Sequence, residues 1–250
     1  MALPRSVMHK LFYSNVHLHT LYSDLTRYLD DPLDAISCEE DDAGNPLITV
    51  GAGSEVPSII RLRAGDVVQN LRSTLDYLVT ELVVANRGVP TDKNAFPVCD
   101  SSRTSFDAAT KSRLKGVSPS AVSLIESLQP YHFREGNENY SVIFILDELA
   151  NINKHRNILL ARKRAVPLDQ MEVIDASGTT IGFDVRLAPD DETVSRLLTE
   201  AIKMKVSKKI SVFVAFDEGP ARGLEVSALL TGLITQIGTE ILPLFAQFFA

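Results

Sequence analysis

The heptapeptide NINKHRN, residues 151–157, contains six polar residues whose side chains can exchange hydrogen bonds or change protonation state. It interrupts the stretch 141–160, whose apolar residues recur at helical spacing and predict a buried helix: Val142, Ile145, Leu146, Leu149 and Ile152. Asn153 and Arg156 continue the same face, so two polar groups are expected in the core. Both need partners, because an unsatisfied buried polar group costs about 1 to 3 kcal/mol and an unpaired charge costs more.

Residues 57–86 contain candidate partners for these polar groups. Their apolar residues alternate spacings of four and three, which predicts a long helix: Ala64, Val68, Leu71, Leu75, Leu78, Leu82 and Ala85. Polar residues flank this stripe on both sides: Gln69, Arg72 and Asp76 on one side, Asp66 and Asn70 on the other. Arg156 paired with Asp66 or Asp76 would match charges across the interface between the two helices.

His155 and Lys154 are expected on other faces of the helix predicted over 141–160. Helical spacing places His155 on the side of Asn151 and Glu148. Either of these side chains could hydrogen-bond one ring nitrogen of His155 and fix the tautomer of the imidazole, whose charge changes near neutral pH.

The stretch VHLHTLYSDL, residues 16–25, resembles the opening motif of the polymerase and histidinol phosphatase metal hydrolases, in which two histidines bind a metal. The chain has three further histidines and no later Asp-His pairs to complete a multinuclear site. In a helix, His17 and His19 lie about 200° apart and cannot hold one ion. The sequence therefore favours a solvent-exposed helix face and predicts no metal site, and no spacing specifies a cofactor.

The helices and strands expected around these residues indicate an α+β protein. Four long helices are expected, at about 7–29, 57–86, 141–160 and 223–248. A hairpin is expected in AISCEEDDAGNPLITVGAG, and strands in MEVI, IGFDVRLA and KISVFVAF. We predict one domain over 1–250, with a helical core at about 57–160 and a mainly antiparallel sheet from the N-terminal hairpin and the C-terminal half.

Composition narrows the possible partners. The chain has 250 residues and a formal net charge of −7, so any contact with nucleic acid must be local. Cys38 and Cys99 lack CxxC spacing, which fits a reducing, cytoplasmic location, and no export signal is visible. The apolar C-terminal run has a short uncharged segment between Glu225 and Glu240, so we expect a docking or homo-oligomer helix and no membrane span.

Four stretches together resemble a bacterial family of uncharacterised proteins: AGDVVQNLRSTLDYLVTEL, FPV, GVSPSAVSLIESLQPY and LDELANINKHRNILL. The family pattern is GDxxHNLRSxLDHL, FPI, LQPY and LxNxDKHR, and the resemblance covers about residues 60–160. Three positions depart from it: Gln69 and Tyr77 stand where the family has histidine, and Asn153 where aspartate is common.

The family pattern is in turn similar to the RxxxxH signature of HEPN domains, which include metal-independent ribonucleases and non-catalytic RNA-binding or scaffold proteins. Arg72 matches the arginine, but Tyr77 occupies the histidine position, and tyrosine titrates near 10. Under this resemblance His155 would replace the histidine. The expected catalytic residues are then His155 and Arg72, and the expected ligand-binding residues are Asn151, Asn153, Lys154, Arg156, Gln69 and Asp76.

Residues 154–164 add a local run of basic side chains without an acid: Lys154, Arg156, Arg162, Lys163 and Arg164. The run favours a phosphate-bearing ligand, although Arg162 to Arg164 could equally protect a strand edge. Two functions follow. The first is a HEPN-like protein that binds RNA or a nucleotide, with ribonuclease activity in question. The second is a non-enzymatic interaction or scaffold protein, in which the polar residues form a satisfied network between helices.

Overall fold

The computed structural model describes residues 2–30, 36–40, 46–50, 55–133, 141–165, 173–174, 180–181 and 211–249, which are mostly helical. The chain divides into two compact units. The first comprises Met1–Ser23, Ser58–Leu159 and Phe216–Ala250, and the second comprises Asp24–Pro57 and Leu160–Ala215. The first, helical unit holds all eight residues that the sequence predicts for a site.

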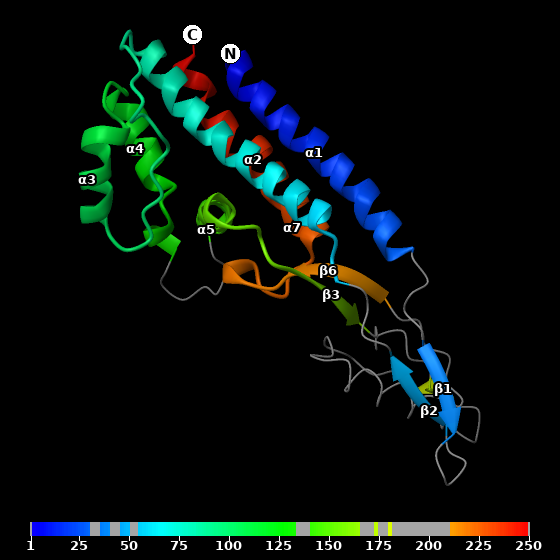
Figure 1. Ribbon diagram of the computed structural model, residues 1–250. Helices are drawn as coiled ribbons and strands as arrows, with labels where there is room; N and C mark the ends of the chain where they lie inside the picture. The colour runs from blue at the N-terminus through cyan, green and yellow to red at the C-terminus, as the bar shows by residue number, and fades with distance from the viewer. Residues whose placement is uncertain are drawn as a thin grey trace. The chain divides into compact units, whose positions relative to one another are not determined.

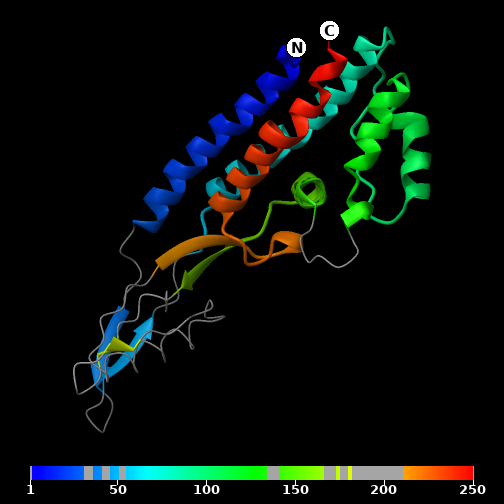
Figure 2. The same ribbon diagram turned by 180° about the vertical axis from the view of Figure 1, so that it is seen from behind.

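Three long helical segments lie side by side in the helical unit: α1 (Arg5–Leu29), α2 (Ser58–Ala85) and α7 (Val226–Gln236) (Figure 1 and Figure 2). α1 runs antiparallel to α2, because successive residues of α1 contact earlier residues of α2: Ser6 with Glu81, Lys10 with Tyr77, and His17 with Asp66. The bounds of α1 and α2 confirm the helices predicted over 7–29 and 57–86.

The apolar stripe of α2 forms the centre of the core. Its fully buried side chains include the three residues Leu71, Leu75 and Leu78, all at 0% exposure. α2 ends at Ala85, where the amides of Arg87 and Gly88 bond back to the carbonyls of Val84 and Val83. Burial of one whole face explains why the four-and-three spacing of α2 is so regular.

Two short helices follow α2. α3 (Arg103–Arg113) begins at Ser102, whose hydroxyl accepts from the amide of Ser105, and α4 (Pro119–Ser127) begins at Ser118, whose hydroxyl accepts from the amide of Ala121. Serine at the N-cap and proline in the first turn both favour a helix start at these places. A short 3-10 turn, η1 (Pro130–Phe133), follows α4.

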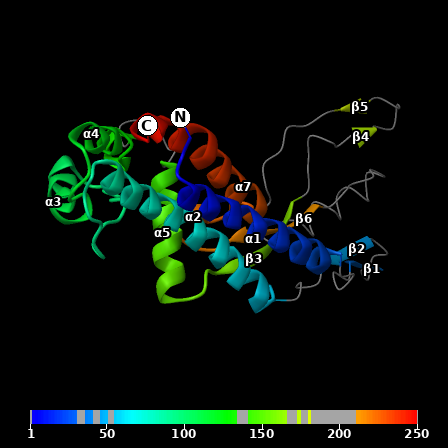
Figure 3. The same ribbon diagram turned by 90° about the horizontal axis from the view of Figure 1, so that it is seen from above.

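α5 (Val142–His155) runs across α2 rather than along it (Figure 1 and Figure 3). It is shorter than the helix predicted over 141–160. The backbone of Arg156 is extended (φ −164°), and strand β3 (Leu160–Ala165) begins soon afterwards. The sequence prediction placed Arg156 on the helix, and this placement was wrong because the helix ends one residue earlier.

The predicted C-terminal helix, about 223–248, is helical but changes type along its length. α7 is followed by a π-helical turn, η3 (Ile237–Ile241), and a 3-10 segment, η4 (Leu242–Phe248). Pro243 lacks an amide hydrogen, so it cannot continue the α-helical bonding of the preceding turn. Its buried residues pack within the chain: Val226, Leu230, Leu233, Ile234, Ile237, Ile241, Leu242 and Phe245.

The same segment also passes a simple test for a membrane span. By length and composition alone, Val226–Phe248 is sufficient to cross a bilayer, with a mean hydropathy of 1.4 over its most apolar 18-residue window, despite Glu240 within it. The expectation from the sequence was based only on the uncharged segment between Glu225 and Glu240, which is too short to cross a membrane. Core helices of water-soluble proteins meet the same criterion, so the segment is weak support for a span.

The second unit holds the described strands. β1 (Ile36–Glu40) and β2 (Pro46–Val50) form the predicted antiparallel hairpin, with Cys38 opposite Ile48. β3 pairs with β6 (Ser211–Phe216), and β4 (Val173–Ile174) pairs antiparallel with β5 (Thr180–Ile181). The described strands thus form three separate pairs, and the larger sheet of the prediction is not found among them.

Candidate functional site

A cavity of about 690 Å³ lies where α2, α5, the segment 95–98 and the end of α3 meet. Its lining residues are Gln69, Arg72, Asp76, Ala95, Val98, Arg113, Asp147, Ala150, Asn151, Asn153 and Lys154. Six of the eight residues that the sequence predicts for a site therefore face one space. The other two, His155 and Arg156, are not part of its wall.

Arg72 is the centre of the polar network in this wall. Its Nε donates to Asp147 Oδ1 (2.8 Å), its Nη1 to Asp76 Oδ1 (2.6 Å) and its Nη2 to the carbonyl oxygen of Phe96 (2.8 Å). Asp76 Oδ1 also accepts from the amide of Phe96 (2.9 Å). One guanidinium thus joins α2, α5 and the segment after α2, with donors in the planar arrangement that arginine provides.

This network contains one cation and two carboxylates. The side chain of Arg72 is 12% exposed, against 22% for Asp147 and 36% for Asp76. Burial alone would lower the pKa of Arg72, but the two carboxylates outweigh it and raise that pKa above its ordinary value. Arg72 therefore stays charged, and it faces two anions. The buried part of the wall has an excess negative charge as a result. Because Arg72 is already paired, it is not a free cation that could bind phosphate.

Two amide side chains complete the polar wall. Gln69 Nε2 donates to the carbonyl oxygen of Ala150 (2.9 Å), and Asn151 Nδ2 donates to Asp147 Oδ2 (3.2 Å). Because carbonyl and carboxylate oxygens only accept, these two contacts fix which end of each amide is the donor. The amide oxygen of Gln69 is left without a partner among the described residues.

Asn153 occupies the crossing point of α2 and α5. The nearest part of α2 is Gly65, where a Cβ atom would lie 2.2 Å from Asn153 Oδ1. A side chain at position 65 would therefore overlap Asn153, so the close approach of the two helices requires glycine there.

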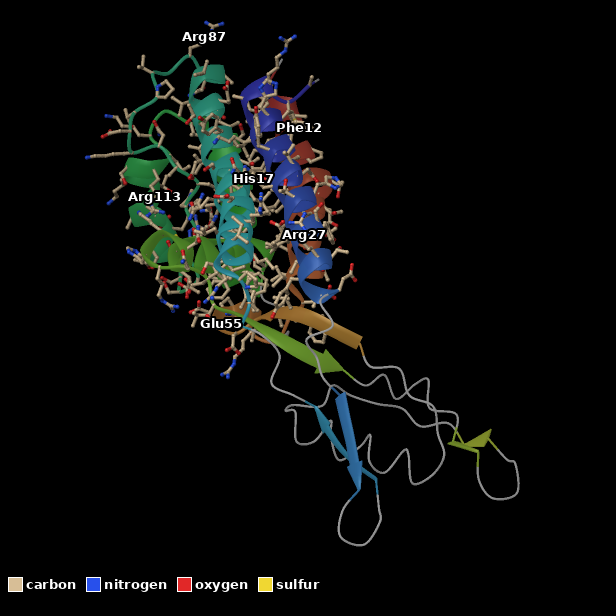
Figure 4. All side chains as sticks on the ribbon, turned by 45° about the vertical axis from the view of Figure 1, so that its right-hand side comes forward. Phe12, His17, Arg27, Glu55, Arg87 and Arg113 are labelled. Atoms are coloured by element: carbon tan, nitrogen blue, oxygen red, sulfur yellow. The ribbon has the colours of Figure 1, made fainter. Side chains whose placement is uncertain are left out.

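Two cations form the exposed part of the wall. Arg113 is the last residue of α3, on the side of α2 away from α1 (Figure 4), and Lys154 is near the end of α5. Both side chains are exposed, and neither forms an ion pair within the part of the chain that the structure describes. The sequence analysis did not single out Arg113 or Asp147. Asp147 precedes Asn151 by one helical turn, which is a usable signal, but nothing local in the sequence indicates Arg113.

The candidate proton-transfer groups lie away from the cavity. His155, the last residue of α5, is exposed and does not line the cavity. Tyr77, in the histidine position of the resemblance, is 43% exposed and its ring lies 5.3 Å from the ammonium of Lys10 on α1. The geometry thus brings neither side chain to Arg72.

Arg156 has a different partner from the one expected. The sequence analysis paired it with Asp66 or Asp76, whereas it forms an ion pair with Glu218. Asp76 instead binds Arg72, and Asp66 lies 3.9 Å from His17 on α1. The pairing was wrong because α5 ends at His155, so the extended backbone carries Arg156 away from α2.

His17 and His19 lie on α1, as expected for a helix face. Within the described ranges, no group of three or more His, Cys, Asp or Glu side chains is arranged to hold a metal ion. The nearest acid to His17 is the single carboxylate of Asp66, at 3.9 Å, which does not make a metal site.

Cys99, next to the cavity wall, is a natural reporter of how firmly the segment 95–98 is held. Its side chain is 8% exposed, and burial raises the pKa of its thiol. We therefore expect iodoacetamide at pH 8 to modify Cys99 at least about tenfold more slowly in the folded protein than in urea. Peptide mass spectrometry measures this rate separately from that of Cys38, and equal rates in both conditions would contradict the packing described.

Comparisons of the chain with protein-family models, with curated proteins and with solved structures found no match. The resemblance to an uncharacterised bacterial family and to HEPN domains therefore remains a prediction.

Proposed function

We propose that the cavity binds a nucleotide or a short stretch of RNA through its phosphate, and does not cleave it. The observation that carries this proposal is a pair of exposed cations, Arg113 and Lys154, at a cavity of about 690 Å³ with hydrogen-bonding side chains beneath them. Neither cation forms an ion pair with another described residue. That volume is in the range of small-molecule sites. Cations without a protein partner are the groups that phosphate oxygens bind.

The two residues expected to transfer protons do not line the cavity, which argues against the expected ribonuclease activity. General acid-base catalysis needs such a group within about 3 Å of the proton it moves. His155 and Tyr77 do not line the cavity. We therefore propose a HEPN-like helical protein that binds RNA or a nucleotide without cleaving it.

A homo-oligomer and a cytoplasmic location are further proposals. The exposed side chains of Leu224, just before α7, and Leu244, in η4, support contact of the C-terminal helical segment with a second copy. The low cysteine content, Cys38 and Cys99 only, supports a reducing compartment.

Replacing Arg113 or Lys154 by alanine is the direct test of the site. Each variant is expected to bind adenosine and guanosine monophosphates about tenfold more weakly, because one charge-assisted contact is lost. The measurement is isothermal titration calorimetry at two salt concentrations. Lys93→Ala is the matched control, since Lys93 is exposed and does not line the cavity.

Unchanged affinity in both cavity variants would reject the site, and so would failure of the natural chain to bind any nucleotide or a short RNA. In that case we would favour the second candidate function, a non-enzymatic scaffold protein. The observation that favours it is the Arg72 network, in which each guanidinium nitrogen already donates to a protein acceptor.

A further inference from the structure

The inner and outer parts of the cavity wall carry opposite charge. The inner part contains Arg72 and the two carboxylates of Asp76 and Asp147, a net charge of one negative unit. The outer part contains the exposed cations Arg113 and Lys154. A phosphate is therefore repelled from the inner part and attracted to the outer part.

Two acceptor atoms of the inner wall have no partner among the described residues. Asp76 binds Arg72 and the amide of Phe96 through Oδ1 alone, so its Oδ2 has no partner among the described residues. The same holds for Oε1 of Gln69, because its Nε2 is the atom that donates to Ala150. A ligand group that contacts these two atoms must consequently supply N–H donors, and an amino group has two of them.

We infer that the cavity holds its nucleotide with the base inside and the phosphate at Arg113 and Lys154, and that it selects bases carrying an exocyclic amino group over uracil and hypoxanthine. This inference rests on the proposed function of the same site. Cytosine, adenine and guanine each present an amino group. Uracil has a carbonyl oxygen where cytosine has its amino group, and hypoxanthine lacks the 2-amino group of guanine. A carbonyl oxygen placed against the carboxylate of Asp76 would leave two acceptors facing each other, which is costly in a partly buried site.

Two pairs of nucleotides test the inference on the natural chain. Cytidine and uridine monophosphates differ in the group at position 4, and guanosine and inosine monophosphates differ only in the 2-amino group. We expect calorimetry to give at least about tenfold tighter binding of the amino-bearing member of each pair. Lys154→Ala is expected to weaken both members of a pair by the same factor and leave their ratio unchanged, because it acts on the phosphate.

The outcomes separate this inference from the proposed function. Binding of all four nucleotides with ratios near one, or tighter binding of uridine and inosine monophosphates, overturns the base selection and leaves the phosphate site standing. A ratio that changes in Lys154→Ala overturns the assignment of the phosphate to the outer cations. Failure of all four nucleotides and of a short RNA to bind overturns the proposed function and the base selection together.

Discussion

Arg72→Ala is expected to lower the free energy of unfolding by about 3 kcal/mol, the cost typical of removing one partner from a buried ion-pair network. Three contacts are lost at once, to Asp147, Asp76 and the carbonyl oxygen of Phe96. The two carboxylates then face each other in a partly buried site without a cation between them. For a chain of this size the loss corresponds to a fall in melting temperature of roughly 10 °C.

Arg72→Lys is expected to recover only part of this loss. A lysine ammonium is a compact charge and lacks the planar set of donors that reaches three acceptors in different directions. Chemical denaturation monitored by circular dichroism measures the free energies of all the variants. The alkylation rate of Cys99 is a second readout, because Arg72 holds the segment that begins at Phe96 and leads to Cys99.

The matched control is Arg103→Ala, at another arginine that pairs with a carboxylate. Arg103 Nη1 lies 2.9 Å from Glu126 Oε1, but its side chain is 69% exposed. Solvent screens such a pair, so the loss is expected to stay below about 1 kcal/mol. Equal losses in Arg72→Ala and Arg103→Ala would refute the structural role assigned to the Arg72 network.

Gly65→Ala is expected to destabilise the protein by about 2 to 3 kcal/mol, as overpacking of a close helix contact does. The added methyl carbon would lie 2.2 Å from Asn153 Oδ1. α5 must move away from α2, or Asn153 must leave its position, and either change disturbs the neighbouring bond from Gln69 to Ala150. Thermal melting and denaturant titration measure the loss.

The double variant Gly65→Ala with Asn153→Ala tests the cause. Removing the Asn153 amide opens the space that the methyl group needs, so the double variant is expected to be more stable than Gly65→Ala alone. The control is Gly232→Ala in α7, where an added Cβ meets nothing within 4 Å. It is expected to be neutral or to stabilise by up to about 1 kcal/mol, because alanine is the better helix former. A harmless Gly65→Ala would show that the helices do not cross as closely as described.

Apolar periodicity and capping residues are sufficient to predict the local elements of this protein. The four-and-three spacing of apolar residues predicts α2 almost to its ends, since one buried face imposes that spacing on any core helix. Ser102 and Ser118 cap α3 and α4 because a serine hydroxyl satisfies amides that the first helical turn leaves free. The faces of α2 and α5 also follow from periodicity, which is why six predicted residues meet at one cavity.

The pairing of charges, in contrast, depends on how the helices pack against one another. Periodicity gives the face of a helix but neither the angle at which two helices cross nor the residue at which each one ends. Because α5 crosses α2 at Gly65 and ends at His155, Asp147 reaches Arg72 while Arg156 turns to Glu218. Arg113 joins the same cavity from α3, although 41 residues separate it from Lys154 in the sequence. Such pairings depend on the packing of several segments together, and no short stretch of sequence contains that information.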